Sequence, residues 1–270
     1  MKLTVLIDNN TYIDRYYLGE PAVSYYIEDG GRKILFDAGY SGAFIKNAEA
    51  MGIHLEELTD VVISHGHNDH TGGLTELMKT EFTGRPIFTA HPDVFLKRSF
   101  EGLDIGCPVS EAEVSDKFDM RLTDRPVKIT DNIIFLGEIP SVHEKRYEIG
   151  TAVKDGKETG DSIMDDSALA CMTEDGIYIV TGCSHSGICN IIERAKQVCR
   201  CDRIIGIIGG MHLFETDERS RQTIDFIKKE NPKELYPCHC TSFRVKAEMD
   251  RSVRVTEVGV GLKLEWREAE

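Results

Sequence analysis

The stretch "VVISHGHNDHTGGL" (residues 61–74) decides how the rest of the sequence is interpreted. It places His65, His67, Asp69 and His70 within six positions, directly after an apolar run and directly before two glycines. A short apolar run of this kind predicts a buried strand. Side chains of an extended loop alternate in direction, so three of the four can point one way while His70 lies one position off. This geometry suits two metal ions side by side.

Imidazole and carboxylate ligands favour zinc, iron, manganese or nickel over magnesium or calcium. We expect two divalent ions, zinc above all, with manganese or iron also compatible. Four ligands do not complete two sites, so further ligands must come from elsewhere. Three later stretches each run from a predicted strand into a loop with a histidine: "IYIVTGCSHSGI" with His185, "RIIGIIGGMHLF" with His212 and "LYPCHCTSF" with His239. Sites in α/β folds form at such strand ends, so we expect these loops to meet the first group.

The composition excludes several classes of function. The formal charge of −14 and the absence of a Lys/Arg-rich run argue against a nucleic-acid partner, although a small basic pocket stays open. The first residues lack the apolar run of a signal peptide, and no stretch of about 18 apolar residues could span a bilayer. We therefore expect a cytoplasmic protein without a membrane partner. Its eight cysteines are then expected to be thiols or ligands rather than disulfides.

The order of elements predicts two αβ layers with the sheets facing each other and the helices outside. The chain could form one large domain or two small ones. A hairpin turning at residues 29–31, a helix at 42–52 and a buried strand at 60–64 open it. The second half alternates strands with helices at 188–199 and 218–230, and two strands are expected to close it, at 254–259 and 261–266. The polar segment 154–166 is expected to be a mobile loop.

The motifs "ILFDAG", "SHGHNDHTGGL", "GEIP", "TGCSHSGICNII", "IGGMHL" and "PCHCTS" occur in an order that resembles the metallo-β-lactamase superfamily. The resemblance narrows to the branch that includes the 7,8-dihydropterin-6-methyl-4-(β-D-ribofuranosyl)-aminobenzene-5′-phosphate synthases. It implies an αββα four-layer sandwich, a single domain over residues 1–270 and a cap or lid inserted at about 99–166.

The resemblance also implies a ligand set. One ion would take His65, His67 and a third histidine, and the other would take Asp69, His70 and a late histidine, which is His239 here. In the superfamily an aspartate in a "TGD" stretch bridges the two ions, whereas this chain reads "TGC" with Cys183. The departure suggests that His185 supplies the third histidine, and that the bridge is a thiolate, a water or nothing.

Several further residues have two readings. Asp37 orients a ligand histidine or begins a turn with Gly39. His212 is an acid or substrate contact, or a hydrogen-bonded loop histidine. Ser184, Ser186 and Gly187 form either a phosphate contact at the start of a helix or an ordinary helix cap.

Three other histidines carry weaker expectations. In other members of the superfamily a histidine near the position of His143 binds metal, but this branch does not need one there. His54 and His91 are flanked by helix signals, and we expect both on the surface.

These observations predict a metal-dependent enzyme acting on a phosphate- or diphosphate-bearing small molecule. Two adjacent ions can activate water for hydrolysis, with Asp69 taking the proton. The resemblance implies a second possibility, in which the ions neutralise the diphosphate that leaves a dihydropterin methyl group as an aromatic ribosyl phosphate takes its place. The same residues serve both reactions, so hydrolase and transferase stay open. A non-catalytic metal-binding or regulatory protein is the alternative, because Cys183 replaces the bridging carboxylate. An oxygen reductase with a diiron site is disfavoured, since His67 stands where that class has glutamate.

Overall fold

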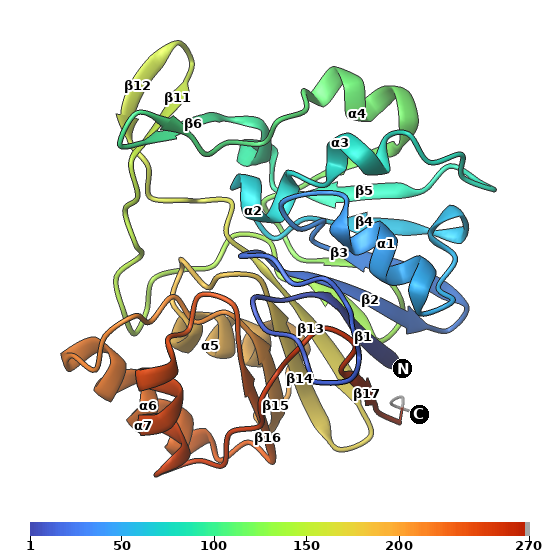
Figure 1. The fold of residues 1–270 in the computed structure, drawn as a ribbon. Helices are drawn as coiled ribbons and strands as arrows, with labels where there is room; N and C mark the ends of the chain where they lie inside the picture. The colour runs from blue at the N-terminus through green and yellow to red at the C-terminus, as the bar shows by residue number, and fades with distance from the viewer. Residues whose placement is uncertain (268–270) are drawn as a thin grey trace.

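Two β-sheets packed face to face form the centre of the molecule, and helices cover both outer faces (Figure 1). The structure is a computed structural model that describes residues 1–267. The αββα four-layer sandwich expected from the sequence is confirmed. The first sheet contains seven strands, in pairing order β17 (Lys263–Glu265), β1 (Lys2–Ile7), β2 (Ser24–Asp29), β3 (Arg32–Phe36), β4 (Asp60–Val62), β5 (Ile87–Ala90) and β8 (Asp119–Leu122).

The second sheet has six strands and is parallel on the side nearest the later ligand loops. Its strands, in pairing order, are β16 (Glu234–Pro237), β15 (Ile204–Gly209), β14 (Gly176–Thr181), β13 (Ala168–Thr173), β10 (Ile133–Phe135) and β9 (Val127–Lys128). β14, β15 and β16 run parallel to one another, so their carboxyl ends meet at one edge. The loops that follow these three strands carry the later histidines of the predicted site.

Three apolar layers hold the sandwich together. The layer between the sheets includes Tyr25 and Phe36 from the first and Phe135 and Tyr178 from the second, all fully buried. Each outer face is buried by helices. The helices are α1 (Ala43–Ala50), α2 (Asn68–Thr71), α3 (Leu74–Leu77), α4 (Glu111–Lys117), α5 (Ile188–Cys199), α6 (Glu218–Glu230) and α7 (Phe243–Asp250), with 3-10 turns η1 (Leu55–Glu57) and η2 (Pro92–Phe95).

Local sequence signals explain several of these elements. The β2–β3 hairpin turns at Gly30 and Gly31, which both have positive φ (54° and 82°), as a two-residue hairpin turn requires. α4 begins with a capping box between Ser110 and Glu113. Asp217 caps α6 by accepting the Ser220 N–H.

The segment 154–166, expected to be a mobile loop, is not a loop throughout, and that part of the prediction is wrong. It contains β12 (Lys157–Gly160), which joins β11 (Thr151–Lys154), β6 (Lys97–Phe100) and β7 (Leu103–Asp104) in a third, small sheet at the upper left of Figure 1. Two of its acids are buried against Arg98, whose guanidinium lies 2.7 Å from Asp161 and 2.6 Å from Asp165. Asp165 also accepts the Gly66 N–H at 2.7 Å, which fastens this segment to the histidine loop.

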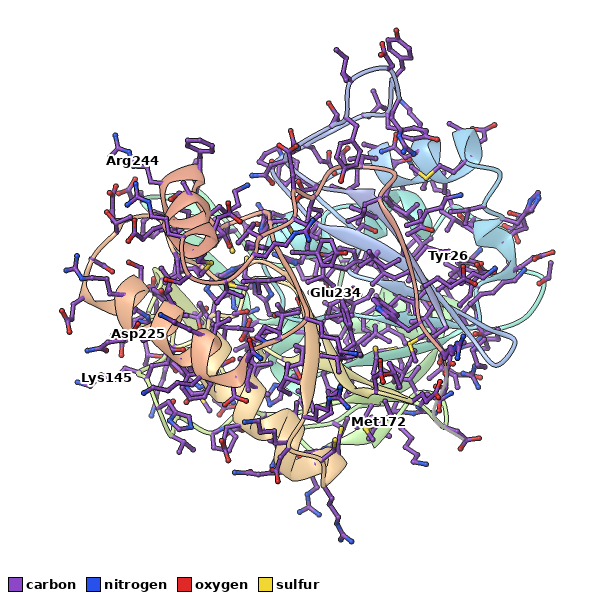
Figure 2. All side chains as sticks on the ribbon, turned by 90° about the horizontal axis from the view of Figure 1, so that it is seen from below. Tyr26, Lys145, Met172, Asp225, Glu234 and Arg244 are labelled. Atoms are coloured by element: carbon purple, nitrogen blue, oxygen red, sulfur yellow. The ribbon has the colours of Figure 1, made fainter. Side chains whose placement is uncertain are left out.

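Other parts of the chain also differ from the expectations. The residues expected as a cap, 99–166, also supply β8, β9 and β10 to the two main sheets. Residues 254–259 form no strand, and the final strand covers only Lys263–Glu265. The eight cysteines are free thiols, as expected. Figure 2 shows charged side chains such as Asp225 and Arg244 on the outer side of the helix layer. Within residues 1–267, none of the helices has the length and apolar character needed to cross a bilayer.

Arg98→Ala should destabilise the fold by about 3–5 kcal/mol, because it leaves the carboxylates of Asp161 and Asp165 buried without their countercharge. Urea unfolding followed by circular dichroism measures the change. Arg125→Ala is the matched control, since the Arg125 side chain is 89% exposed, and should shift stability by less than about 0.5 kcal/mol. Equal effects of the two substitutions would contradict a structural role for the buried ion pair.

Candidate metal centre

The ends of β4, β14, β15 and β16 bring the histidine-bearing loops together at one edge of the sandwich. The six predicted metal ligands fall into two groups whose ligand atoms lie within 4.8 Å of one another in each group. The first group is His65, His67 and His185. The second is Asp69, His70 and His239, joined by Cys183. The structure therefore assembles both predicted sets of residues, one beside the other.

The first group is buried and has nitrogen atoms without protein partners. His65 Nε2 and His67 Nδ1 lie 3.0 Å apart, close to the separation of about 3.3 Å that two nitrogens have on a tetrahedral zinc with Zn–N bonds of about 2.0–2.1 Å. Both ring nitrogens of His185 are buried with no hydrogen-bond partner, as is His67 Nε2. Buried polar atoms are normally satisfied. A metal ion would supply the missing partner of His185, so the residues fit an ion here.

Burial also keeps these rings neutral. It lowers the pKa of His65 and His185 well below the ordinary value, and the neighbouring histidines lower it further. Burial likewise lowers the pKa of His67 to about 4. A neutral imidazole is the form that binds a metal ion.

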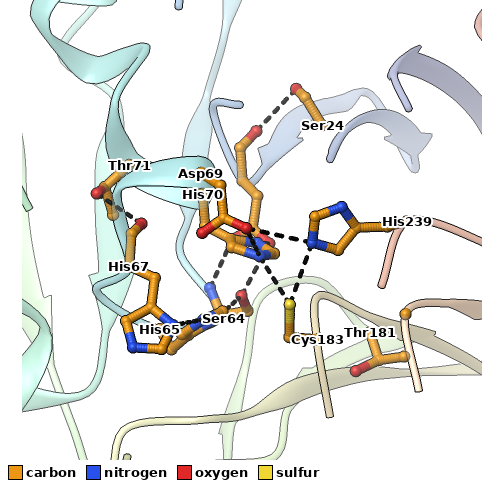
Figure 3. Close-up of polar contacts among 12 residues, drawn as sticks. Ser24, Ser64, His65, His67, Asp69, His70, Thr71, Thr181, Cys183 and His239 are labelled. Atoms are coloured by element: carbon orange, nitrogen blue, oxygen red, sulfur yellow. Dashed lines mark hydrogen bonds and ion pairs between the residues drawn. The ribbon is translucent and has the colours of Figure 1, made fainter. Parts of the chain in front are cut away.

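The second group converges on one sulfur and one carboxylate. Cys183 Sγ lies 3.2 Å from His70 Nε2 and 3.1 Å from His239 Nε2. The same two nitrogens lie 3.6 and 3.3 Å from Asp69 Oδ2 (Figure 3). Cys183 thus lies among the donors of the second group. In the sequence it stands where the superfamily has a bridging aspartate.

Groups behind the histidines hold the other ring nitrogens. Asp37 Oδ2 lies 2.6 Å from His70 Nδ1, which is the orienting contact expected of Asp37. Ser64 Oγ lies 3.0 Å from His65 Nδ1 and donates to Asp37 at 2.8 Å. Asn9 Oδ1 lies 3.1 Å from His239 Nδ1. Such contacts fix the tautomer and turn Nε2 of each ring toward the metal position.

Sequence reasoning missed two of these orienting residues. Ser64 directly precedes His65, so its position offered a signal. Asn9 lies 230 residues from His239 and only the folded chain shows the contact.

In the second group, carboxylates and histidines stabilise one another's charged forms. Burial by itself disfavours the charged His70 ring, but Asp69 and Asp37 outweigh it and raise the pKa of His70 to about 9. Burial likewise opposes the charged form of Asp69, and His70 and His239 outweigh it and lower the pKa of that carboxyl. An incoming cation would therefore meet an ionised Asp69 and displace a proton from His70.

The serines expected at a phosphate site are already engaged within the protein. The N–H and hydroxyl of Ser186 both donate to the buried carboxylate of Asp166, at 2.8 and 2.5 Å. Ser184 donates to a backbone carbonyl at 2.7 Å, and a side chain at Gly187 would collide with Glu144. The protein's own carboxylates occupy the start of α5, so the predicted substrate role of Ser184, Ser186 and Gly187 finds no support here.

The remaining histidines lie apart from the two groups. His143 is partly exposed and lies 3.5 Å from Glu193. His54 is exposed, as expected. The prediction that His91 lies on the surface is wrong: its ring is buried, and its Nδ1 accepts the Asp93 N–H at the start of η2.

A cavity of about 460 Å³ lies over the two groups. His212 lines it beside His185, with ring centroids 4.4 Å apart, and its Nδ1 is buried without a partner. Neither lysine nor arginine occurs among the described residues that line the cavity. The full lining is Asn9, Pro21, Tyr40, His67, Asn68, Asp69, Phe100, Ile105, Ile149, Cys183, His185, His212, Phe214, His239 and Cys240.

Comparison with known proteins agrees with this arrangement. The family model of the metallo-beta-lactamase superfamily matches residues 18–123, which include the histidine loop. The 7,8-dihydropterin-6-methyl-4-(beta-D-ribofuranosyl)-aminobenzene-5′-phosphate synthase of Methanocaldococcus jannaschii is 33% identical over 82% of this chain and 80% of its own length. The chain belongs to the metallo-β-lactamase superfamily.

Two further relatives of this superfamily member cover almost its whole length. An uncharacterized protein of Methanocaldococcus jannaschii is 31% identical over 92% of this chain and 94% of its own. The crystal structure of a metal-dependent hydrolase of the beta-lactamase superfamily superposes with a TM-score of 0.86 at 26% identity, covering 99% of this chain and 100% of that one. The branch expected from the motifs is therefore confirmed.

Gly182→Ala should loosen the centre, because the added Cβ would lie 2.3 Å from Ser64 Oγ and 2.8 Å from Asp37 Oδ2. We expect a loss of about 1–3 kcal/mol of stability from overpacking and a loss of about 10–100-fold in zinc affinity from displacing the orienting groups. Urea unfolding and competition with a chromophoric chelator measure the two effects. The control is Gly84→Ala, which meets nothing within 4 Å. Wild-type zinc affinity in Gly182→Ala would show that the orienting contacts do not matter.

Proposed function

We propose that the protein is a metal-dependent enzyme that acts on a phosphate- or diphosphate-bearing small molecule through two adjacent metal ions. One observation carries the proposal: two groups of metal-binding side chains, His65/His67/His185 and Asp69/His70/His239, lie side by side beneath one cavity. Zinc matches the nitrogen, oxygen and sulfur donors, and manganese or iron would match the nitrogen and oxygen donors.

When bound, two such ions would lower the pKa of a bound water for attack at phosphorus, or would neutralise the oxygens of a departing diphosphate. The protein's own residues would divide the remaining work. Asp69 is ionised and its side chain is 29% exposed toward the cavity, so it can accept the proton of the attacking group. His212 lines the cavity with an unpartnered Nδ1, which can donate a proton or hydrogen bond to the departing group.

The lining of the cavity supports an anionic substrate held by metal ions. Because no lysine or arginine occurs among its described lining residues, the metal ions would be the positive charges that a phosphate meets there. The relative named as a synthase has a phosphate in the name of its product, which supports the same class of molecule. Hydrolysis and diphosphate-releasing transfer use the same residues, so the proposal covers both.

The mouth of the cavity would suit a planar ring. Tyr40, Phe100 and Phe214 line it and are 53%, 44% and 53% exposed, so their rings are accessible to a ligand. Aromatic faces stack on flat heterocycles, and apolar walls with a few polar groups are typical of ligand sites. We therefore favour substrates in which an aromatic or pterin-like ring carries the phosphate.

Wild-type protein, purified without a chelator or a histidine tag, should contain about two zinc, manganese or iron ions per chain. His185→Ala should fall toward one, because the first group loses the histidine whose nitrogens have no protein partner. Element-resolved mass spectrometry gives the counts, and His54→Ala is the control because His54 is exposed and outside both groups. Metal-free wild type that resists reloading would contradict the dinuclear site. Two bound ions without turnover of any phosphate ester or pterin diphosphate would contradict the enzymatic role.

Phe214→Ala should raise KM for an aryl phosphate by about threefold to tenfold through lost ring stacking, while leaving kcat for an alkyl phosphate unchanged. Steady-state kinetics on the two esters separates these effects. Phe243→Ala provides the control, because Phe243 is 81% exposed and does not line the cavity. An identical KM for the aryl ester in wild type and Phe214→Ala would exclude ring stacking at this position.

A further inference from the structure

Cys240 brings a second thiol to the centre. It follows His239 in "PCHC", and its side chain lines the cavity on the side of His212. The ligand atoms of Cys183, His212 and Cys240 lie within 4.8 Å of one another. This group differs from the two described above, because only Cys183 belongs to both it and the Asp69/His70/His239 group.

The contacts of the group hold its donors in place. Cys240 Sγ accepts the backbone N–H of His212 at 3.2 Å and lies 3.5 Å from the carbonyl oxygen of Cys183. Gly210 leaves room for the sulfur, since a Cβ there would lie 2.4 Å from it. His212 Nδ1 is buried and has no hydrogen-bond partner. Two thiols and one imidazole therefore lie close enough together to bind one ion.

Two sulfurs and one imidazole form a soft donor set. A Cys₂His set with the fourth position left to a small molecule is a known arrangement for zinc. Thiolates select soft and borderline ions over manganese, magnesium and calcium. Binding would form two metal–sulfur bonds, with the two thiol protons passing to solvent.

We propose that Cys183, His212 and Cys240 form an additional metal position, adjoining the proposed dinuclear centre, which takes a soft divalent ion such as cadmium when that ion is supplied beyond the two ions of the centre. The position shares the sulfur of Cys183 with that centre and rests on the proposed function only through this shared atom. With this position included, the centre has two sulfur donors in addition to its histidine and aspartate ligands. An ion held there would occupy the imidazole of His212, which would then no longer donate to the departing group as proposed above. The fourth position of that ion is left to a ligand in the cavity.

Titration of the metal-free protein with Cd²⁺ tests this position, with thiolate-to-cadmium charge-transfer absorption in the ultraviolet as the readout. Wild type should develop the absorption of two thiolates, and Cys240→Ser should reduce it to about half, because only Cys183 remains. Cys189→Ser is the matched control: Cys189 is also buried, but it lies on α5 and belongs to none of the groups. It should leave the absorption unchanged.

Full absorption in Cys240→Ser, or cadmium bound to wild type without thiolate absorption, would overturn the additional position. Neither result would affect the two-ion count that tests the proposed function, so the two failures can be told apart. If Cys240→Ser does not fold, cadmium-113 NMR of the wild type decides. A resonance shifted downfield as expected for two sulfur ligands supports the position, and resonances confined to nitrogen, oxygen or single-sulfur coordination overturn it.

Discussion

The buried carboxylate of Asp37 is the contact on which the rest of the centre depends. It is fully buried and accepts hydrogen bonds from the Ser64 N–H at 2.7 Å and the Ser64 hydroxyl at 2.8 Å, and it contacts His70 Nδ1 at 2.6 Å. A buried carboxylate is costly unless such partners satisfy it. These partners are the start of the histidine loop and one of its ligands, so satisfying Asp37 sets the position of both. Gly182, from the second sheet, is packed against the same carboxylate.

Four residues that border the centre have a left-handed backbone conformation. Asp37, Ser184, His212 and His239 all have positive φ, between 49° and 59°, although none is a glycine. Residues in this region cost about 1–3 kcal/mol each and persist only where the surroundings determine them. All four border the metal-binding groups, which places the strained backbone where ligands must be aimed. The third sheet also helps to position the histidine loop. Arg98 of that sheet pairs with Asp165, and Asp165 accepts the Gly66 N–H of the loop.

Much of the fold and of the centre could be predicted from the sequence. The spacing of His65, His67, Asp69 and His70 after an apolar run located the first half of the centre. The repeated pattern of a strand ending in a histidine located His185 and His239, because carboxyl ends of parallel strands share an edge. The remaining contacts depend on pairs distant in sequence. No local sequence pattern predicts the contacts of Asn9 with His239, Arg98 with Asp161 or Cys183 with Cys240. The segment 154–166 was misjudged for the same reason: its polar residues suit a solvated loop, and only the distant guanidinium of Arg98 allows Asp161 and Asp165 to be buried.

The central claim is that two ions occupy neighbouring positions held by the two groups of ligands. Anomalous X-ray scattering at the zinc edge, from crystals of the zinc-loaded protein, tests it most directly because it places each ion without reference to activity. We predict two peaks about 3.5–4 Å apart, one among His65, His67 and His185 and the other among Asp69, His70 and His239. Zinc-loaded crystals that show no peak in these groups, or only a single peak, would contradict the two-ion centre.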